Sequence, residues 1–404
     1  MAPLVVSHIS MRRALIIGAS IIVLFGGALT AYYYFFANTP SLSVAPSTSL
    51  PSAAGNESQT LTNGNDNPAV PAATKVTARL VKISQGPVVP GVVVVDMVAS
   101  SSTDVDVRFI ERQSGNIFSY LVHEEALTRT SNRTLPGIAE AHWLPSGQTV
   151  FVRYLSGDTL STINTYGLMA DGSSGFFLPQ DLVGIAVSST SILALASGAN
   201  GSVASLMHTD GTRASTLFSS PLSSLRVLLG GKDQYFAFTK PAQSLLGDLF
   251  LIDKAGNFSR LAGPLPGLVA LASPSGKEVL VSYMADGVMR MALVNTATRA
   301  VTRLPVATIA DKCVWAADDS AVYCGIPTAP SREYSYPDDW YQGAIPFNDR
   351  IWRISVGGRY AQLVLDFSLA NSGLLDATAL ATDRAGTALI FVNKNDGSLW
   401  SYQL

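Results

Sequence analysis

The side chains best suited to binding chemistry lie between Gly325 and Arg350. Four aromatic residues and two carboxylates fall close together there: Tyr334, Tyr336, Asp338, Asp339, Trp340 and Tyr341. Tyrosine and tryptophan rings beside acids suit stacking on a peptide or a sugar, and long loops on a rigid scaffold often carry binding. We therefore predict a ligand-binding loop. The alternative is that the loop folds back and its aromatic side chains pack as a plug.

Residue patterns typical of catalysis or metal binding are not evident. The four histidines, which are His8, His123, His142 and His208, lack the close spacing typical of metal ligands. No Gly-x-Ser-x-Gly elbow and no glycine-rich phosphate loop occurs. The Asp-Gly pairs are expected to form turns, with calcium ligation as the alternative. We predict no catalytic residues, no metal and no cofactor.

An enzyme remains the second reading of the sequence. A hydrolase or lyase that acts on glycans or peptides would need carboxylates converging from several parts of the chain. Asp338, Asp339 and Asp349, together with Glu111 or Arg153, are the candidates. Such acids lying about 5–10 Å apart in a central pocket would favour this reading.

The two cysteines, Cys313 and Cys324, are 11 residues apart and flank a sequence typical of two short strands around an Asp-Asp-Ser turn. At that separation the two residues can lie opposite each other on paired strands, close enough for a disulfide. We predict this disulfide; two free buried thiols are the alternative.

A strand, a tight turn and a second strand recur along the chain. The clearest copy is Trp143–Gly147 followed by Gln-Thr-Val-Phe-Val, and Ala272–Gly276 followed by Lys-Glu-Val-Leu-Val is similar. Looser copies begin at Leu229, Trp315 and Thr382. Each turn contains the Gly, Asn, Asp or Ser residues that tight antiparallel turns require.

A second signature alternates with the first. It is an apolar residue, a polar turn and then a leucine, and it occurs in Ile110–Leu121, Met169–Leu178, His208–Leu217, Ile252–Leu261, Val294–Leu304 and Ile354–Leu363. Repeating units then begin near residues 88, 137, 181, 223, 266, 307 and 371. A period of about 40–50 residues with four short strands per unit is typical of a β-propeller.

The sequence thus predicts an all-β fold over residues 76–404, a β-propeller of seven blades, with six to eight as the range. The last unit has room for three strands, so we expect 76–84 to supply its fourth strand and close the ring. The unit that begins near 307 contains the insertion at about 325–350. Trp143 is expected to pack between blades.

The hairpin Ala272-Ser-Pro-Ser-Gly-Lys277 resembles the Ser-Pro-Asp-Gly-Lys repeats of TolB-like and related WD-type propellers. The resemblance covers residues 76–404 at the level of the fold, and the His to Trp-Asp signature of WD repeats is missing. It implies a scaffold for protein interactions and no particular activity.

Residues 14–37 contain no charged side chain and are long enough to cross a bilayer as a helix. Arg12 and Arg13 precede this run, and no Lys or Arg follows it before Lys75. The positive-inside rule then places residues 1–13 in the cytoplasm and the propeller on the periplasmic or extracellular side. We predict an uncleaved single-pass anchor; a cleaved signal peptide is the alternative.

Residues 38–75 are rich in Ser, Thr, Pro, Asn and Ala and are predicted to be a flexible linker with a reach of roughly 35 Å. The net charge of −2 and the absence of a basic cluster argue against nucleic acid as a partner, so we predict none. The sequence therefore predicts a membrane-tethered, extracytoplasmic propeller that acts as a binding or scaffold module for a protein or cell-envelope ligand.

Overall fold

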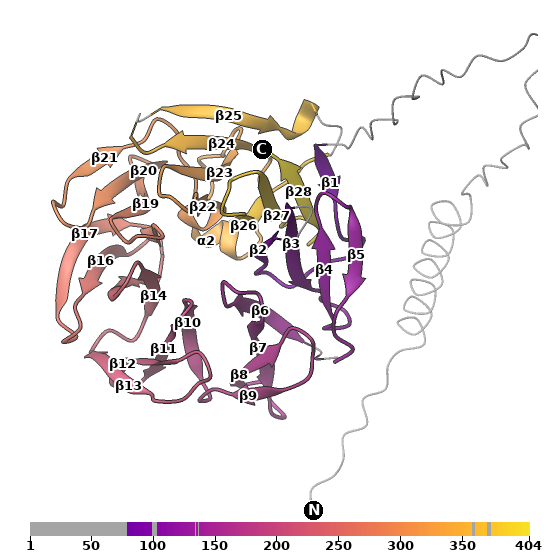
Figure 1. Cartoon of the computed structure of the whole chain (residues 1–404). Helices are drawn as coiled ribbons and strands as arrows, with labels where there is room; N and C mark the ends of the chain where they lie inside the picture. The colour runs from indigo at the N-terminus through magenta and orange to yellow at the C-terminus, as the bar shows by residue number, and fades with distance from the viewer. Residues whose placement is uncertain (1–78, 99–102, 134, 136, 358–359, 370–372) are drawn as a thin grey trace, which may run out of the picture. The chain divides into compact units, whose positions relative to one another are not determined.

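The computed structural model describes residues 79–404, except 99–102, 134, 136, 358–359 and 370–372. Within these residues the strands form seven sheets of four antiparallel strands each. The sheets are arranged around a central axis like the blades of a propeller (Figure 1). The predicted all-β, seven-bladed propeller is confirmed.

Each of the first four blades is a meander whose strands follow one another in sequence from the axis outward. Blade 1 contains β2 (Val93–Val98), β3 (Thr103–Ile110), β4 (Ile117–Leu121) and β5 (Ala126–Arg129). Blade 2 contains β6 (Ile138–Trp143), β7 (Thr149–Ser156), β8 (Thr162–Met169) and β9 (Gly175–Phe177). Blade 3 contains β10 (Leu182–Val187), β11 (Ser191–Gly198), β12 (Gly201–His208) and β13 (Ser215–Ser220). Blade 4 contains β14 (Leu225–Gly230), β15 (Gln234–Thr239), β16 (Leu246–Ile252) and β17 (Phe258–Pro266).

The short helices accompany blades 6 and 7, the last two of the remaining blades. Blade 5 contains β18 (Val269–Ala272), β19 (Glu278–Ala285), β20 (Val288–Asn295) and β21 (Val301–Arg303). Blade 6 contains η1 (Ala310–Lys312), β22 (Cys313–Trp315), β23 (Ala321–Pro327), α2 (Asp338–Tyr341), β24 (Asp349–Ser355) and β25 (Ala361–Asp366). After η2 (Phe367–Leu369), blade 7 contains β26 (Ala377–Thr382), β27 (Ala388–Asn393), β28 (Leu399–Gln403) and β1 (Leu80–Lys82).

The ring closes through strand β1, as the sequence predicts. β1 is the outermost strand of blade 7 and pairs with β28 in antiparallel register, with Leu80 opposite Tyr402 and Lys82 opposite Trp400. The backbone N–H of Gln403 also donates to the carbonyl of Arg79 at 2.9 Å. The first and last described strands thus share one sheet.

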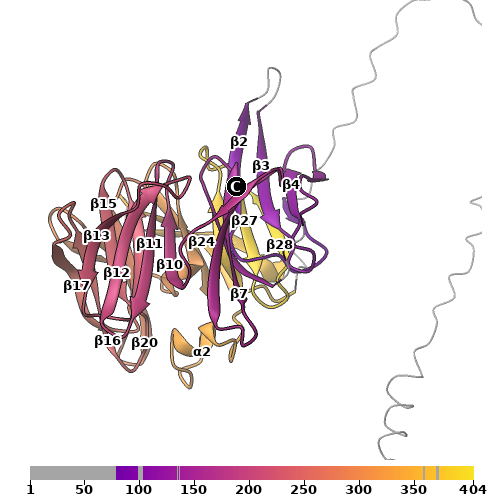
Figure 2. The same cartoon turned by 90° about the horizontal axis from the view of Figure 1, so that it is seen from below.

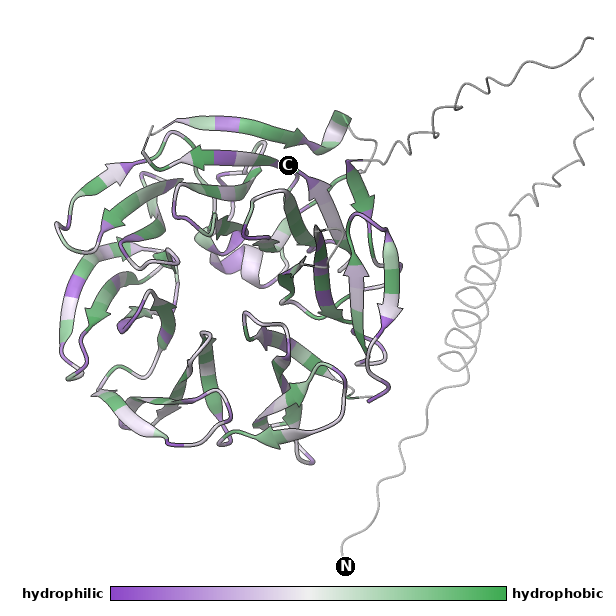
Figure 3. Cartoon of the chain, in the orientation of Figure 1, coloured by the Kyte–Doolittle hydropathy of each residue, from purple (hydrophilic) through white to green (hydrophobic). Residues whose placement is uncertain are grey.

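The second strand of each blade supplies much of the core. All residues of β23 and β27 are buried, whereas the outer strand β21 has no buried residue. Figure 3 shows the corresponding pattern, with hydrophobic residues concentrated along the strands. Buried side chains of neighbouring blades form shared clusters, so the apolar runs of the sequence stabilise contacts between blades.

The first turn signature occupies one end of the propeller, which we call the turn face. Four blades repeat the same turn between their first and second strands, in which Gly147, Gly276, Asp319 and Gly386 have positive φ. In each, the N–H of that residue donates to the carbonyl three positions earlier. Positive φ favours glycine and is tolerated by aspartate, which explains the recurring residue types.

The second turn signature is not uniform. In five blades it joins the third and fourth strands, as in His208–Leu217 between β12 and β13. In blade 1, however, Ile110–Leu121 contains the turn between β3 and β4, the second and third strands. The sequence pattern recurs there because any tight hairpin needs the same turn residues, whichever strands it joins.

The predicted transmembrane segment and linker, residues 14–37 and 38–75, lie outside the described residues. Among the helices of the described part of the chain, none has the length and apolar character needed to span a membrane.

Candidate functional site

The insertion connects β23 to β24 and comprises residues 328–348, because 325–327 belong to β23 and 349–350 to β24. It contains the short helix α2. Figure 2 shows α2 at the opposite end of the propeller from the β2–β3 hairpin. We call this end the insertion face.

Three aromatic side chains anchor the insertion to the propeller. Tyr336 and Trp340 are each 3% exposed, and Phe347 is 4% exposed. The rings of Tyr336 and Phe347 lie 5.5 Å apart, and those of Trp340 and Phe347 stack at 6.2 Å. These three side chains therefore pack as a plug, which is the alternative to a ligand-binding loop.

The two acids of the predicted site both accept hydrogen bonds from backbone N–H groups. The Asp338 carboxylate accepts a hydrogen bond from the backbone N–H of Gln243 in blade 4 at 2.7 Å. The Asp339 carboxylate accepts one from the backbone N–H of Ser335 at 2.6 Å. Both carboxylates are therefore engaged within the chain.

Tyr341 links α2 to two other elements. Its hydroxyl donates to Asp311 at 2.7 Å, and Arg226 donates to the same hydroxyl at 3.2 Å. Arg226 also forms two hydrogen bonds with Asp311, at 2.9 and 3.2 Å. Tyr341 remains 38% exposed, and Tyr334 is partly buried against the same core. All six predicted residues lie in the insertion, four of them on α2. Their binding of a ligand stays a prediction.

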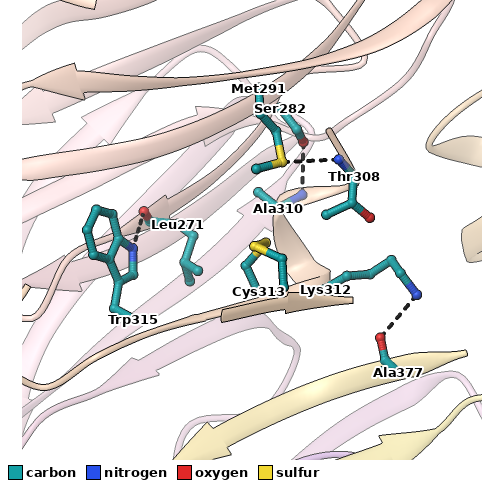
Figure 4. Close-up of a disulfide and its surroundings, with 10 residues drawn as sticks. Leu271, Ser282, Met291, Thr308, Ala310, Lys312, Cys313, Trp315 and Ala377 are labelled. Carbon is teal, nitrogen blue, oxygen red and sulfur yellow. Dashed lines mark hydrogen bonds between the residues drawn. A yellow bond between two sulfur atoms is a disulfide. The ribbon is translucent and has the colours of Figure 1, made fainter. Parts of the chain in front are cut away.

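The predicted disulfide is present beneath the insertion. Cys313 on β22 and Cys324 on β23 are directly opposite in register, with their Cα atoms 4.1 Å apart. Figure 4 shows this bond and the adjacent Lys312, whose side chain points to Ala377. The sequence separation sufficed for this prediction because it matches the register of a tight hairpin.

A buried ion cluster lies next to the disulfide. Lys312, Asp349 and Asp376 have fully buried side chains. The ammonium Nζ of Lys312 donates to Asp349 Oδ2 at 2.7 Å, to the carbonyl of Ala377 at 3.0 Å and to Asp376 Oδ1. Sequence reasoning found Asp349 only as a candidate acid and did not find the other two, because their approach depends on the contact between blades 6 and 7.

Burial controls the electrostatics of this cluster. Loss of solvation raises the pKa of Asp349 to about 6, because burial disfavours the charged form. The Lys312 charge opposes this shift, and the neighbouring Asp376 adds to it. The Oδ1 atom of Asp349 is buried and has no hydrogen-bond partner among the described residues.

The turn face contains a solvent-open cavity of about 660 Å³. Blades 1, 2, 5, 6 and 7 contribute its lining, which comprises Val92, Val93, Val94, Pro145, Pro274, Val314, Trp315, Ala317, Asp318, Leu380, Ala381, Thr382 and Arg384. The walls are mainly apolar, and the charged side chains Asp318 and Arg384 are exposed. A concave apolar site with few polar groups is a common form of binding site.

A second cavity of about 590 Å³ adjoins the first and shares Pro145 and Pro274 with it. Its other walls come from blades 3 and 4, including Ser188–Ser191 and Leu229–Tyr235. Together the two cavities, which we call the turn-face mouth, take lining residues from all seven blades. The repeated turns that revealed the fold therefore also line a concave surface to which all seven blades contribute.

The acids proposed for catalysis do not meet in this mouth. Asp349 is buried beside Lys312, and Glu111 accepts a hydrogen bond from Ser114 at 2.5 Å. Arg153 donates to Glu140 and to the carbonyl of Leu182. Within the described residues no group of three or more His, Cys, Asp or Glu side chains could hold a metal ion.

No protein-family model matches the sequence, and no curated protein matches it either. The propeller is similar in structure to an oligogalacturonate lyase in complex with manganese, with a TM-score of 0.52 and 9% identity over 80% of this chain and 98% of that one. The oligogalacturonate lyase of Vibrio parahaemolyticus gives a TM-score of 0.52 and 9% identity over 79% and 98% of the two chains. For TolB from Acinetobacter baumannii the TM-score is 0.40, with 9% identity over 78% of this chain and 79% of that one.

At these identities the similarity concerns the fold alone. The propeller fold implied by the resemblance to TolB-like proteins is confirmed, since the chain forms seven four-stranded blades. The activity named for the lyases is a property of those proteins.

Proposed function

We propose that this protein is a binding or scaffold module, tethered to the membrane and facing the periplasm or the cell exterior, whose turn-face mouth receives a segment of a protein partner. The observation that carries the proposal is the turn-face mouth itself, which is open to solvent and lined by all seven blades. A ligand held there would contact several blades at once, as binding sites at the ends of rigid scaffolds do.

The lining favours a partner with apolar side chains and a few charges. Val92, Val94 and Leu380 supply apolar wall, and burial of apolar area is the main source of affinity in such contacts. Asp318 and Arg384 supply one negative and one positive charge in the first cavity, and Asp233 and Lys232 supply one of each in the second. This combination suits an extended peptide segment better than a highly charged polymer.

The hydrolase or lyase reading gains no support from the acids named for it. Asp338 and Asp339 accept hydrogen bonds from the backbone, and the Asp349 side chain is fully buried beside Lys312. Among the residues that line the 660 Å³ cavity, Asp318 is the one carboxylate. A pair of converging acids, which glycoside hydrolysis commonly uses, is therefore not formed by these residues.

The test places a photoreactive amino acid at Arg384 or at Tyr334 in the full chain, expressed in its own cells. Arg129 on the outermost strand of blade 1 is exposed and provides the matched control. We expect crosslinks to one protein from Arg384 and none from Arg129. Crosslinks from Tyr334 alone would move the binding site to the insertion, and equal labelling at all three positions would contradict a specific site.

The tether is supported by the apolar run 14–37 and by the arginines before it. The disulfide is also typical of an oxidising compartment. Protease added to spheroplasts should release a fragment that begins within residues 38–75. Complete protection of the propeller in spheroplasts, with digestion after lysis, would contradict the proposed orientation.

A further inference from the structure

The cluster of Lys312, Asp349 and Asp376 contains the parts needed to form an amide bond. An amine and two carboxyl groups are in direct contact and fully buried. The Lys312 Nζ atom also lies 5.1 Å from the ring centres of Trp340 and Phe347, so aromatic rings flank the cluster. An environment that excludes water favours condensation, because water is the product and would otherwise reverse the reaction.

The two carboxyl groups differ in how their oxygens are held. Asp376 presents Oδ1 to Lys312, while its Oδ2 accepts hydrogen bonds from Trp340 Nε1 at 2.9 Å and from the backbone N–H of Phe347 at 3.0 Å. Two N–H donors on one oxygen form the kind of site that stabilises an oxyanion during attack on a carboxyl carbon. Asp376 is therefore equipped as the electrophile.

Asp349 is held differently. Its Oδ2 lies 2.7 Å from Lys312 Nζ and accepts the N–H of Ala377, while its Oδ1 has no partner among the described residues. Apart from Lys312 itself, Asp349 thus has one N–H donor, that of Ala377, whereas Asp376 has two, and Asp349 touches the reacting nitrogen. A carboxyl group in this place, with its pKa raised by burial to about 6, is suited to carry protons in both directions near neutral pH.

We propose that Lys312 and Asp376 form an intramolecular isopeptide bond, with Asp349 as the catalytic proton carrier. Because the fold holds the two reacting groups in contact, the entropic cost of bringing them together is met before the reaction starts. The bond would covalently join blade 6, through η1, to the residue that precedes the first strand of blade 7.

The reaction balances without an oxidant or an external reagent. A proton moves from the Lys312 ammonium to Asp376, which leaves a neutral amine and a carboxylic acid and removes two buried charges. Nζ then attacks Cγ of Asp376, and negative charge develops on Oδ2 between Trp340 and Phe347. Asp349 takes a proton from the nitrogen and delivers it to the departing hydroxyl. The products are one amide and one water, and Asp349 returns to its starting protonation state.

The test is the intact mass of the full chain, purified and reduced so that the disulfide does not contribute. We expect a mass lower than that of the sequence by one water, and a digest in which the peptides containing Lys312 and Asp376 are joined. A folded wild-type protein with the complete mass and no joined peptides would overturn the proposal.

Variants separate the chemistry from a purely structural role. Lys312→Arg keeps the charge but cannot form the amide, and Asp349→Asn keeps the size but removes the proton carrier; both should show the complete mass. Lys394→Arg is the matched control. The Lys394 ammonium donates to the carbonyl of Trp340, and the contact of Lys394 with Asp376 is a hydrogen bond between their backbones, which the substitution keeps. The Lys394→Arg variant should still lose one water.

Folding of each variant is checked by formation of the Cys313–Cys324 disulfide under non-reducing conditions. Loss of water in the Lys312→Arg variant would contradict the assignment of the amine. Loss of water in the Asp349→Asn variant, at the wild-type rate, would contradict the role of Asp349.

Discussion

Two tryptophans act as equivalent contacts between blades. Trp143 ends the first strand of blade 2, and its Nε1–H donates to the carbonyl of Gly91 in the segment leading into blade 1, at 3.3 Å. Trp315 ends the first strand of blade 6 and donates to Leu271 in blade 5, at 3.2 Å. Each side chain is therefore buried between two blades and donates to a partly buried carbonyl. This agrees with the expectation that Trp143 has a packing role.

Replacing Trp143 with phenylalanine should lower the free energy of unfolding by roughly 1–3 kcal/mol, because a partly buried hydrogen bond is lost and the smaller ring fills less of the interface. Trp315→Phe should have a similar effect, and the two changes should be nearly additive because the residues share no partner. Denaturant unfolding of both single variants and the double variant measures this. An unchanged midpoint for either single variant would contradict the proposed contact.

His142 gives the stability a pH dependence. Burial lowers its pKa in the folded protein to about 4, below the ordinary value of 6.5, although Glu140 lies 3.6 Å from its Nε2. The unfolded chain therefore binds a proton that the folded chain does not, and stability falls as the pH decreases from about 6.5 towards 4.

We expect wild type to lose stability relative to His142→Gln over this pH range. The free energies of unfolding of both proteins should be compared at pH values above and below the interval. The raised pKa of Asp349 acts with the opposite sign and is common to both proteins, so it cancels in the comparison. Parallel pH profiles would show that His142 does not titrate in this way.

At the scale of single elements, the insertion was found because it interrupts the repeat. The position of the insertion in the sequence could be predicted, but whether its aromatic side chains point into the propeller or into solvent could not. Trp340 becomes buried because Asp376 and Lys394, which are distant in sequence, supply partners for its indole N–H and its carbonyl. Such partners depend on how two blades meet, and no local pattern encodes that.

The disulfide cross-links the two strands of the first hairpin of blade 6. Replacing Cys313 and Cys324 with alanine should lower the free energy of unfolding by roughly 2–3 kcal/mol, because the closed loop is short. Thermal unfolding of the double variant and of reduced wild type should give similar midpoints. A variant as stable as the oxidised protein would mean that the bond does not constrain the unfolded chain.

At the scale of the whole molecule, the architecture was predictable because each blade repeats the same physical requirements. Strands need apolar runs, and tight turns need residues that accept positive φ. The first strands of the blades begin at Val93, Ile138, Leu182, Leu225, Val269, Cys313 and Ala377. The largest offset from the predicted unit starts is six residues, from 307 to Cys313 and from 371 to Ala377. The turn-face mouth was not predicted, since it arises only when all seven blades are assembled.

Closure by β1 should be essential for this assembly. A chain that starts at Arg79 retains β1, whereas one that starts at Pro87 loses it and exposes the edge of β28. We expect the shorter chain to lose roughly 0.5–1.5 kcal/mol for each missing hydrogen bond and to associate through the free edge. Thermal unfolding and size-exclusion chromatography test this. Equal stability and a monomeric shorter chain would show that β1 is dispensable.

The closing strand also sets the mechanical behaviour of the ring. Any tension carried by the chain before Arg79 enters the propeller at β1, which is held to β28 by three residue pairs. A pull along the strand loads these pairs together in shear, whereas an outward pull peels them one at a time from Leu80. The disulfide in blade 6 lies outside this load path. Resistance of the ring to force is therefore determined by the pairing of β1 with β28 rather than by the disulfide.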